Sequence, residues 1–141
     1  MKCKIINGPN LNLLGKRETD IYGEESFDTY LEKLKAKFPA LTIDYYQSNI
    51  EGEIIDELQR IDEKYDAVIL NAGGYTHTSV AIADAVASMK TGVIEVHISN
   101  IMNREHYRSN SLIAPKCLGT ITGFGLNGYE LAVYAIVKEG S

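Results

Sequence analysis

Strand-like and helix-like segments alternate along this chain, and the alternation limits the folds open to it. The clearest strand-like segment, "DAVILNAGG" at residues 66–74, is almost continuously apolar, which is typical of parallel strands buried on both faces. Further strand-like segments are predicted at residues 2–7, 41–47, 92–99 and 117–125. These segments are therefore expected to form one buried sheet.

Helices are predicted around these strands from apolar residues at helical spacing. They cover residues 26–38, 48–61, 78–90 and 127–140. Ser26 is expected to cap the first helix and Pro39 to end it, while Ser48 and Glu51 have the spacing of a capping box at the second. Gly92 is the expected stop of the third helix. In the last helix the predicted apolar stripe consists of Tyr129, Val133, Ile136 and Val137.

This order of elements predicts the fold class. Alternating strands and helices imply a parallel sheet with right-handed crossovers, and a chain of 141 residues fits one domain. We therefore expect residues 1–141 to form a single α/β domain, a flavodoxin-like three-layer sandwich with five parallel strands in the order 2-1-3-4-5. In such sheets ligands bind at the carboxyl ends of the strands, near the switch point between the first and third strands.

Charge and cysteine content narrow the range of partners and settings. The formal net charge of −5 argues against nucleic acid as the main partner, although a small anionic ligand could still meet a locally positive site. Cys3 and Cys117 form no CxxC pair, so neither a disulfide scaffold nor a zinc site is expected, and a reduced, cytoplasmic setting fits. No signal peptide is recognised, and no apolar run approaches the roughly 20 residues of a membrane helix.

Polar side chains follow the predicted first, third and fourth strands where each strand ends. They are Asn7, Asn10, Asn12, Arg17 and Tyr22 after the first, Asn71, Gly73, Gly74, Thr76, His77 and Thr78 after the third, and His97, Ser99, Asn100, Arg104, His106 and Arg108 after the fourth. Since the carboxyl ends of parallel strands share one edge of a sheet, the three segments are expected to converge. Their convergence indicates a site more strongly than any single motif.

Glu95 and His97 are two residues apart on the predicted fourth strand, so their side chains point to the same face. A carboxylate within a buried strand is costly unless it is paired, and the imidazole two residues along is the simplest partner. Such a pair would orient the imidazole and favour its protonated form, as a general acid requires. The alternative is a structural Glu–His pair that closes the strand end.

Arg17 and Tyr22 share the long loop after the first strand. A free tyrosine, with a pKa of about 10, is a poor base at neutral pH unless its phenolate is stabilised. One adjacent guanidinium, in a site shielded from water, could lower that pKa enough for Tyr22 to act as a base. The alternative is a solvated arginine beside a tyrosine that packs as a loop lid.

His77 and Asp84 are weaker candidates. His77 precedes the third helix, and Asp84 follows about two turns later on a similar side. A loop histidine bonded to backbone and a solvated helix aspartate are the alternatives. The Gly73–Gly74 pair most simply supports a turn with unusual backbone angles, and it matches neither of the common glycine-rich phosphate-loop patterns.

Three motifs of this chain together resemble the type II 3-dehydroquinate dehydratases. They are "NGPNLNLLGKRE" with "YG" at residues 7–23, "NAGGYTHTSVAIADA" at 71–85 and "EVHISN" at 95–100, with Arg108 beyond. The resemblance covers nearly the whole chain. It implies dehydration of 3-dehydroquinate to 3-dehydroshikimate, in the shikimate pathway of aromatic amino-acid biosynthesis or in quinate breakdown, without a metal or organic cofactor. It also implies a homo-oligomer, a dodecamer built from trimers.

The resemblance also implies roles for individual residues. Tyr22 would take a proton from the carbon beside the ketone, activated by Arg17, and Asn10 would help to hold a water facing the enolate oxygen. His97, oriented by Glu95, would protonate the departing hydroxyl. The substrate would be held by Asn71, His77, Arg108 and the backbone N–H groups of Ile98 and Ser99.

Two positions bear on assembly and on loop behaviour. Asp84 is expected to reach the site of a neighbouring subunit, which would couple catalysis to assembly. Thr19 stands where members of the family often have proline. Because proline would stiffen the loop, this departure bears on loop mobility and turnover rather than on the chemistry.

Other functions are compatible with the predicted fold. A flavin carrier would need a phosphate-cradling loop and a flanking aromatic pair, and the predicted site lacks both. A phospho-receiver would need an aspartate where Asn7 and Asn71 stand. A Schiff-base route would need a desolvated lysine, and only Lys16 is near the predicted site. A different lyase or hydrolase on the same scaffold is the strongest of these alternatives.

Overall fold

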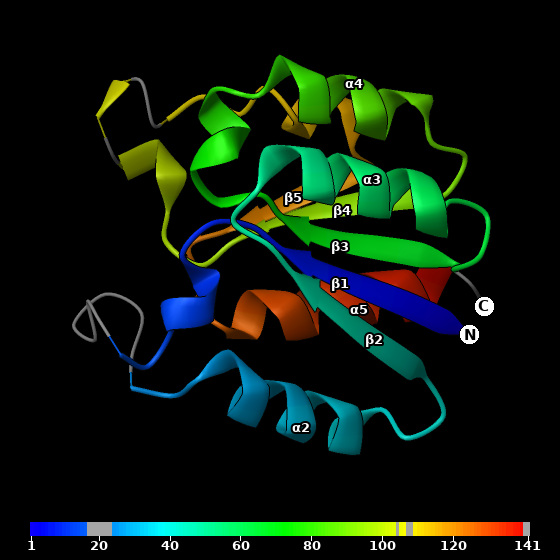
Figure 1. Cartoon of the computed structure of the whole chain (residues 1–141). Helices are drawn as coiled ribbons and strands as arrows, with labels where there is room; N and C mark the ends of the chain where they lie inside the picture. The colour runs from blue at the N-terminus through cyan, green and yellow to red at the C-terminus, as the bar shows by residue number, and fades with distance from the viewer. Residues whose placement is uncertain (17–23, 104, 107–108, 140–141) are drawn as a thin grey trace.

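The computed structural model describes residues 1–16, 24–103, 105–106 and 109–139. Within these residues, five strands form one parallel sheet in the order β2-β1-β3-β4-β5 (Figure 1). The strands are β1 (Lys2–Asn7), β2 (Thr42–Gln47), β3 (Ala67–Asn71), β4 (Gly92–His97) and β5 (Gly119–Thr122). The predicted fold class and strand order are confirmed, and the switch point lies between β1 and β3.

Helices cover both faces of the sheet. α3 (Glu51–Ile61) and α4 (Val80–Ser88) lie on one face, and α2 (Phe27–Lys37) and α5 (Asn127–Glu139) lie on the other (Figure 1). Short 3-10 turns in the connections are η1 (Leu11–Leu13), η2 (Gly73–His77), η3 (Ile101–Asn103) and η5 (Ala114–Lys116). Among the described residues, no helix has the length and hydropathy needed to span a bilayer.

Alternate strand residues feed two separate hydrophobic cores. Ile5 of β1 and Ile69 of β3 pack with side chains of α2 and α5, while Ile6 and Leu70 pack with side chains of α3 and α4. All four are fully buried. This arrangement explains why the β3 segment is apolar throughout, because both of its faces lie under helices.

The helix starts agree with the sequence prediction at α2 and differ from it at α3. Ser26 caps α2 as predicted, its hydroxyl oxygen accepting a backbone N–H of the first turn at 3.2 Å. The predicted capping box of Ser48 and Glu51 is wrong, because α3 begins after Ile50 and no side chain caps it. Ser48 instead donates its hydroxyl to Glu53 at 2.5 Å and accepts the N–H of Ile50 at 3.0 Å. The N–H of Ile50 therefore takes the Ser48 oxygen that the capping box would have offered to the N–H of Glu51.

Two further details of the predicted helices need correction. Gly92 does not stop α4, which ends at Ser88 with Met89 as its C-cap. Gly92 instead begins β4, where an added Cβ atom would lie 2.4 Å from a methyl group of Leu118. Val137 is exposed, because it lies one residue, about 100° around the helix, beyond the last buried position of the α5 stripe.

Candidate active site

The segments that follow β1, β3 and β4 meet at the carboxyl edge of the sheet (Figure 1). Asn7, the last residue of β1, pairs in register with Asn71, the last residue of β3, and β4 lies directly beside β3. The predicted convergence of the three segments is therefore seen in their described parts. Outside the described residues lie Arg17, Thr19, Tyr22, Arg104 and Arg108.

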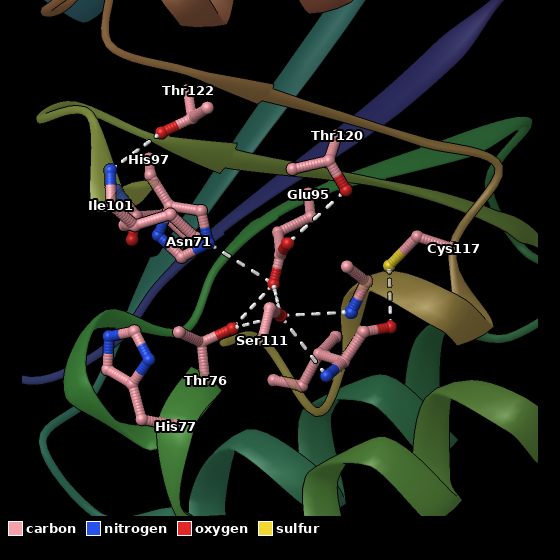
Figure 2. Close-up of polar contacts among 12 residues, drawn as sticks. Asn71, Thr76, His77, Glu95, His97, Ile101, Ser111, Cys117, Thr120 and Thr122 are labelled. Atoms are coloured by element: carbon pink, nitrogen blue, oxygen red, sulfur yellow. Dashed lines mark hydrogen bonds and ion pairs between the residues drawn. The ribbon is translucent and has the colours of Figure 1, made fainter. Parts of the chain in front are cut away.

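Glu95 is a fully buried carboxylate on β4. Within the described residues, three hydroxyl groups donate to it (Figure 2). Thr76 Oγ1 lies 2.5 Å and Ser111 Oγ 2.6 Å from Oε2 of Glu95, and Thr120 Oγ1 lies 3.3 Å from Oε1. These donors come from η2, from the segment before η5 and from β5. Hydrogen bonds from three directions offset the cost of burying the charge.

His97 lies on the same face of β4 as Glu95, as predicted, and is only 5% exposed. Its Nε2 atom is 3.2 Å from Oε2 of Glu95, close enough for an ion pair when the ring is protonated, although no described atom meets hydrogen-bond geometry with Nε2. Burial opposes ionisation of Glu95, but His97 and the hydroxyls of Ser111 and Thr76 outweigh it and hold the pKa of this carboxyl below its usual value. Glu95 is therefore ionised at neutral pH and can orient an imidazolium ring.

His77 ends η2 and is bonded to the segment that runs from β4 towards β5. Its Nδ1 atom lies 2.7 Å from the carbonyl oxygen of Asn110, and since a carbonyl only accepts, Nδ1 carries the proton of that bond. Beside it, the N–H of Leu112 donates to the carbonyl of Thr76 at 2.7 Å. The backbone-bonded alternative for His77 is thus present in the structure, and a contact between His77 and substrate stays a prediction.

A buried tyrosine of α5 joins Asn71 and Asn7 beneath this edge of the sheet. The amide nitrogen of Asn71 donates to the hydroxyl of Tyr129 at 2.9 Å, and that hydroxyl donates to Oδ1 of Asn7 at 2.7 Å. The Asn71 oxygen accepts the N–H of Gly73 at 3.1 Å, and the Asn7 nitrogen donates to the hydroxyl of Tyr45 at 3.3 Å. The sequence predicts Tyr129 only as part of an apolar stripe, so sequence reasoning misses its polar role.

The other predicted residues differ in exposure, and Ile98 is buried. Asn10 is exposed, at the N-cap of η1, with a left-handed φ of 70°. Ile98 and Ser99 follow β4, and their carbonyl oxygens accept hydrogen bonds at 2.9 Å from donors in and after β5. Asp84 is exposed on α4. The described cluster around Glu95 and His97 is therefore built mainly from η2, β4 and the segment before β5.

The hydroxyls around Glu95 are a second group that sequence reasoning does not single out. Thr76 is recognised only as one polar residue after the third strand, and Ser111 and Thr120 carry no motif. The available signal is the buried carboxylate itself, which requires donors, but the fold decides which residues supply them. Among the described residues, no group of three or more His, Cys, Asp or Glu side chains could hold a metal ion.

Comparison with known sequences identifies relatives over nearly the whole chain. A family model described as "Dehydroquinase class II" matches residues 1–137. The 3-dehydroquinate dehydratase of Campylobacter jejuni subsp. jejuni is 51% identical over 140 residues, covering 98% of this chain and 88% of that protein. The 3-dehydroquinate dehydratase of Caldicellulosiruptor saccharolyticus is 50% identical over 138 residues, covering 96% of this chain and 95% of that protein.

Solved structures agree with the sequence comparison. The type II dehydroquinase of Butyrivibrio crossotus DSM 2876 has a TM-score of 0.92 and 44% identity, covering 97% of each chain. The type II dehydroquinase of Propionibacterium acnes also has a TM-score of 0.92, with 34% identity over 97% of this chain and 96% of that chain. From the family model, these relatives and the shared fold, the chain belongs to the class II dehydroquinase family.

Proposed function

We propose that this chain is a 3-dehydroquinate dehydratase, a hydro-lyase that removes water from 3-dehydroquinate to give 3-dehydroshikimate. The observation that carries the proposal is the Glu95–His97 pair, in which an ionised, buried carboxylate lies 3.2 Å from an imidazole at the carboxyl edge of the sheet. Relatives that are 51% and 50% identical bear the name of this enzyme. The reaction would serve the shikimate pathway or quinate breakdown.

Loss of water beta to a ketone needs a base, an acid and a group that stabilises the enolate. In the proposed mechanism Tyr22, activated by Arg17, takes the proton from the carbon beside the ketone, and the electrons of that C–H bond form the enolate. Asn10 helps to hold a water that faces the enolate oxygen. As the enolate collapses, the bond between carbon and the leaving hydroxyl breaks, and His97 donates the proton that completes the water molecule.

The described residues support the acid half of this mechanism. Glu95 and His97 are both buried, so their electrostatic interaction is less weakened by water than at an exposed site. The hydroxyls on Glu95 keep this carboxylate in place, and a fixed carboxylate restricts the direction in which the neighbouring imidazole can point. A restrained imidazole that can carry a proton is what a general acid requires.

Substrate binding and assembly complete the proposal. The substrate would be held by Asn71, His77, Arg108 and the backbone N–H groups of Ile98 and Ser99. Asp84 would reach the site of a neighbouring subunit in a dodecamer built from trimers, and its exposure on α4 supports this role, because such a residue must be accessible in the isolated chain. We also propose that the enzyme is a single catalytic domain that acts in the cytoplasm and uses no metal or organic cofactor.

An ultraviolet assay tests the proposed function, because the product contains a conjugated enone. The purified chain is mixed with 3-dehydroquinate in the presence and absence of a chelator. We expect the enone absorbance to rise at the same rate in both samples, and at least about 10²-fold more slowly with the His97→Ala variant. No absorbance change with the wild-type chain would contradict the proposal and would favour a different lyase or hydrolase on the same scaffold.

A further inference from the structure

Tyr129, near the start of α5, buries a hydroxyl group beneath the carboxyl ends of β1 and β3. The residue is fully buried, and its ring centroid lies 4.9 Å from that of Phe27 and 6.2 Å from that of Tyr30. Phenylalanine would serve these ring contacts equally well. The hydroxyl therefore needs a separate explanation, and its bonds to Asn71 and Asn7 supply one.

These bonds belong to a chain of hydrogen bonds that can run in one direction only. Gly73 contributes a backbone N–H, which is purely a donor, so the Asn71 atom that faces it must be the amide oxygen. The Asn71 nitrogen then donates to Tyr129. The proton of Tyr129 is left for the oxygen of Asn7, whose nitrogen donates to Tyr45.

The direction of this series of hydrogen bonds sets the orientation of both asparagine amides. An asparagine amide can be turned over with little change of shape, which exchanges its oxygen for its NH2 group. Turning Asn71 over would place its NH2 group against the N–H of Gly73. Burial raises the pKa of the Tyr129 phenol. The hydroxyl therefore keeps the proton that it donates to Asn7 in this series of hydrogen bonds. Successive hydrogen bonds in the same sense also strengthen one another.

We propose that Tyr129 is a positioning residue of the dehydratase site, whose hydroxyl, together with the N–H of Gly73, fixes the atom that Asn71 presents to the substrate and holds Asn7 at the start of the loop after β1. The proposal rests on the proposed function, in which Asn71 binds the substrate. Tyr129 lies in the core beneath the sheet edge and acts through the two asparagines. Its bond to Asn71 uses one of the two amide protons, and the other can serve a substrate hydroxyl.

Asn7 extends the effect of Tyr129 to the loop that follows β1. Asn7 is the last residue of this strand, and its carbonyl accepts the N–H of Ser48 at 3.0 Å. The next residue, Gly8, donates its N–H to the carbonyl of Asn71 at 2.7 Å. Without the Tyr129 hydroxyl, the Asn7 amide oxygen would lose its donor at the point where the loop leaves the sheet.

The variant Tyr129→Phe removes the hydroxyl and keeps the ring. We expect KM for 3-dehydroquinate to rise about tenfold, the effect of one misdirected hydrogen bond, while kcat stays within about threefold of the wild-type value. Tyr30→Phe is the matched control. Tyr30 belongs to the same aromatic cluster, but its hydroxyl takes no part in the hydrogen bonds that join Asn71, Tyr129 and Asn7. The KM of this variant should not change. An unchanged KM in Tyr129→Phe would overturn the proposal.

A double variant separates positioning from a general loss of stability. If Tyr129 acts through Asn71, the rise in KM caused by Tyr129→Phe should shrink in an Asn71→Ala background, where no amide is left to orient. If the two changes instead multiply in full, Tyr129 acts independently of Asn71 and the proposal fails. Loss of stability alone would lower the fraction of active enzyme and hence kcat, and would leave KM unchanged.

Neutron diffraction from the deuterated wild-type protein provides a test without any variant, and it decides the proposal if Tyr129→Phe does not fold. We expect the deuterium of Tyr129 to point at Oδ1 of Asn7 and an amide deuterium of Asn71 to point at Tyr129. A Tyr129 deuterium directed at Asn71 would overturn the proposal. A wild-type chain that is inactive on 3-dehydroquinate would instead refute the proposed function, so the two failures can be told apart.

Discussion

At the scale of single residues, the site depends on a carboxylate that stays charged in the protein interior. Both oxygens of Glu95 accept hydrogen bonds, Oε2 from Thr76 and Ser111 and Oε1 from Thr120. His97 approaches only Oε2, so it could not satisfy the whole carboxylate by itself. His97 and the hydroxyls therefore act together to stabilise the charged form of Glu95.

Acid unfolding should report the charge on Glu95. Because its pKa is lowered in the folded state, Glu95 adds stability above its ordinary pKa of about 4.3, and this contribution is lost as the pH falls through the lower, folded-state pKa. We expect Glu95→Gln to lose less unfolding free energy than the wild type between about pH 5 and pH 3, measured by urea unfolding. Glu32→Gln, which changes a side chain that is 77% exposed, should keep the wild-type slope. An equally steep loss of unfolding free energy in Glu95→Gln would contradict the conclusion that folding lowers the pKa of Glu95.

His97→Ala should separate the two proton transfers of the proposed mechanism. Loss of the general acid should slow the release of water by about 10²–10⁴-fold. Exchange of the substrate's alpha hydrogen with solvent deuterium should continue, because the proposed base is Tyr22. Nuclear magnetic resonance of the recovered substrate measures this exchange. If exchange stops as well, the division of roles between Tyr22 and His97 is wrong.

At the scale of secondary-structure elements, the sequence predicts the existence of each strand and helix better than its ends. β1 is predicted to the residue. The predicted third strand continues to residue 74, but β3 ends at Asn71, and the φ of 60° at Gly73 turns the chain into η2. At α3 the N–H of Ile50 donates to the Ser48 oxygen that the predicted cap required. Ends depend on such local competition, which periodicity does not report.

Gly8→Ala tests how tightly the loops after β1 and β3 are packed together. A Cβ atom at Gly8 would lie 2.6 Å from the carbonyl oxygen of Ala72, and a backbone atom cannot rotate away as a side chain can. We expect the variant to lose about 1–3 kcal/mol of unfolding free energy, measured by urea unfolding. The matched control is Gly52→Ala in α3, where nothing lies within 4 Å, and it should be neutral or stabilising by up to about 1 kcal/mol. Equal stabilities for the two variants would contradict the close approach.

At the scale of the whole molecule, the strand order could be predicted because alternation and right-handed crossovers leave few topologies open. The surface could not be predicted in the same way. Leu118, Phe124 and Tyr134 would count as core residues by composition, yet all three are exposed in the single chain. Hydrophobic patterning cannot distinguish a residue buried within one chain from a residue that a second chain would bury.

Asp84→Ala tests whether catalysis and assembly are coupled. If Asp84 reaches a neighbouring subunit's site, its loss should raise KM, weaken the oligomer or do both, because an exposed carboxylate on α4 would no longer meet its partner. Analytical ultracentrifugation and steady-state kinetics measure the two effects. Lys90→Ala removes another exposed charge, just after α4, and should change neither. An unaltered oligomer with normal kinetics in Asp84→Ala would count against the shared site.

The position of Tyr129 in the order of the chain has a consequence for biosynthesis. α5 follows all five described strands, so a ribosome synthesises the strand residues before it adds this helix. During translation, the asparagines at the ends of β1 and β3 therefore exist for a time without the phenol that orients them. The asparagine orientation that we propose is therefore the last part of the site to be completed, because it waits for the final helix to be synthesised and to pack against the sheet.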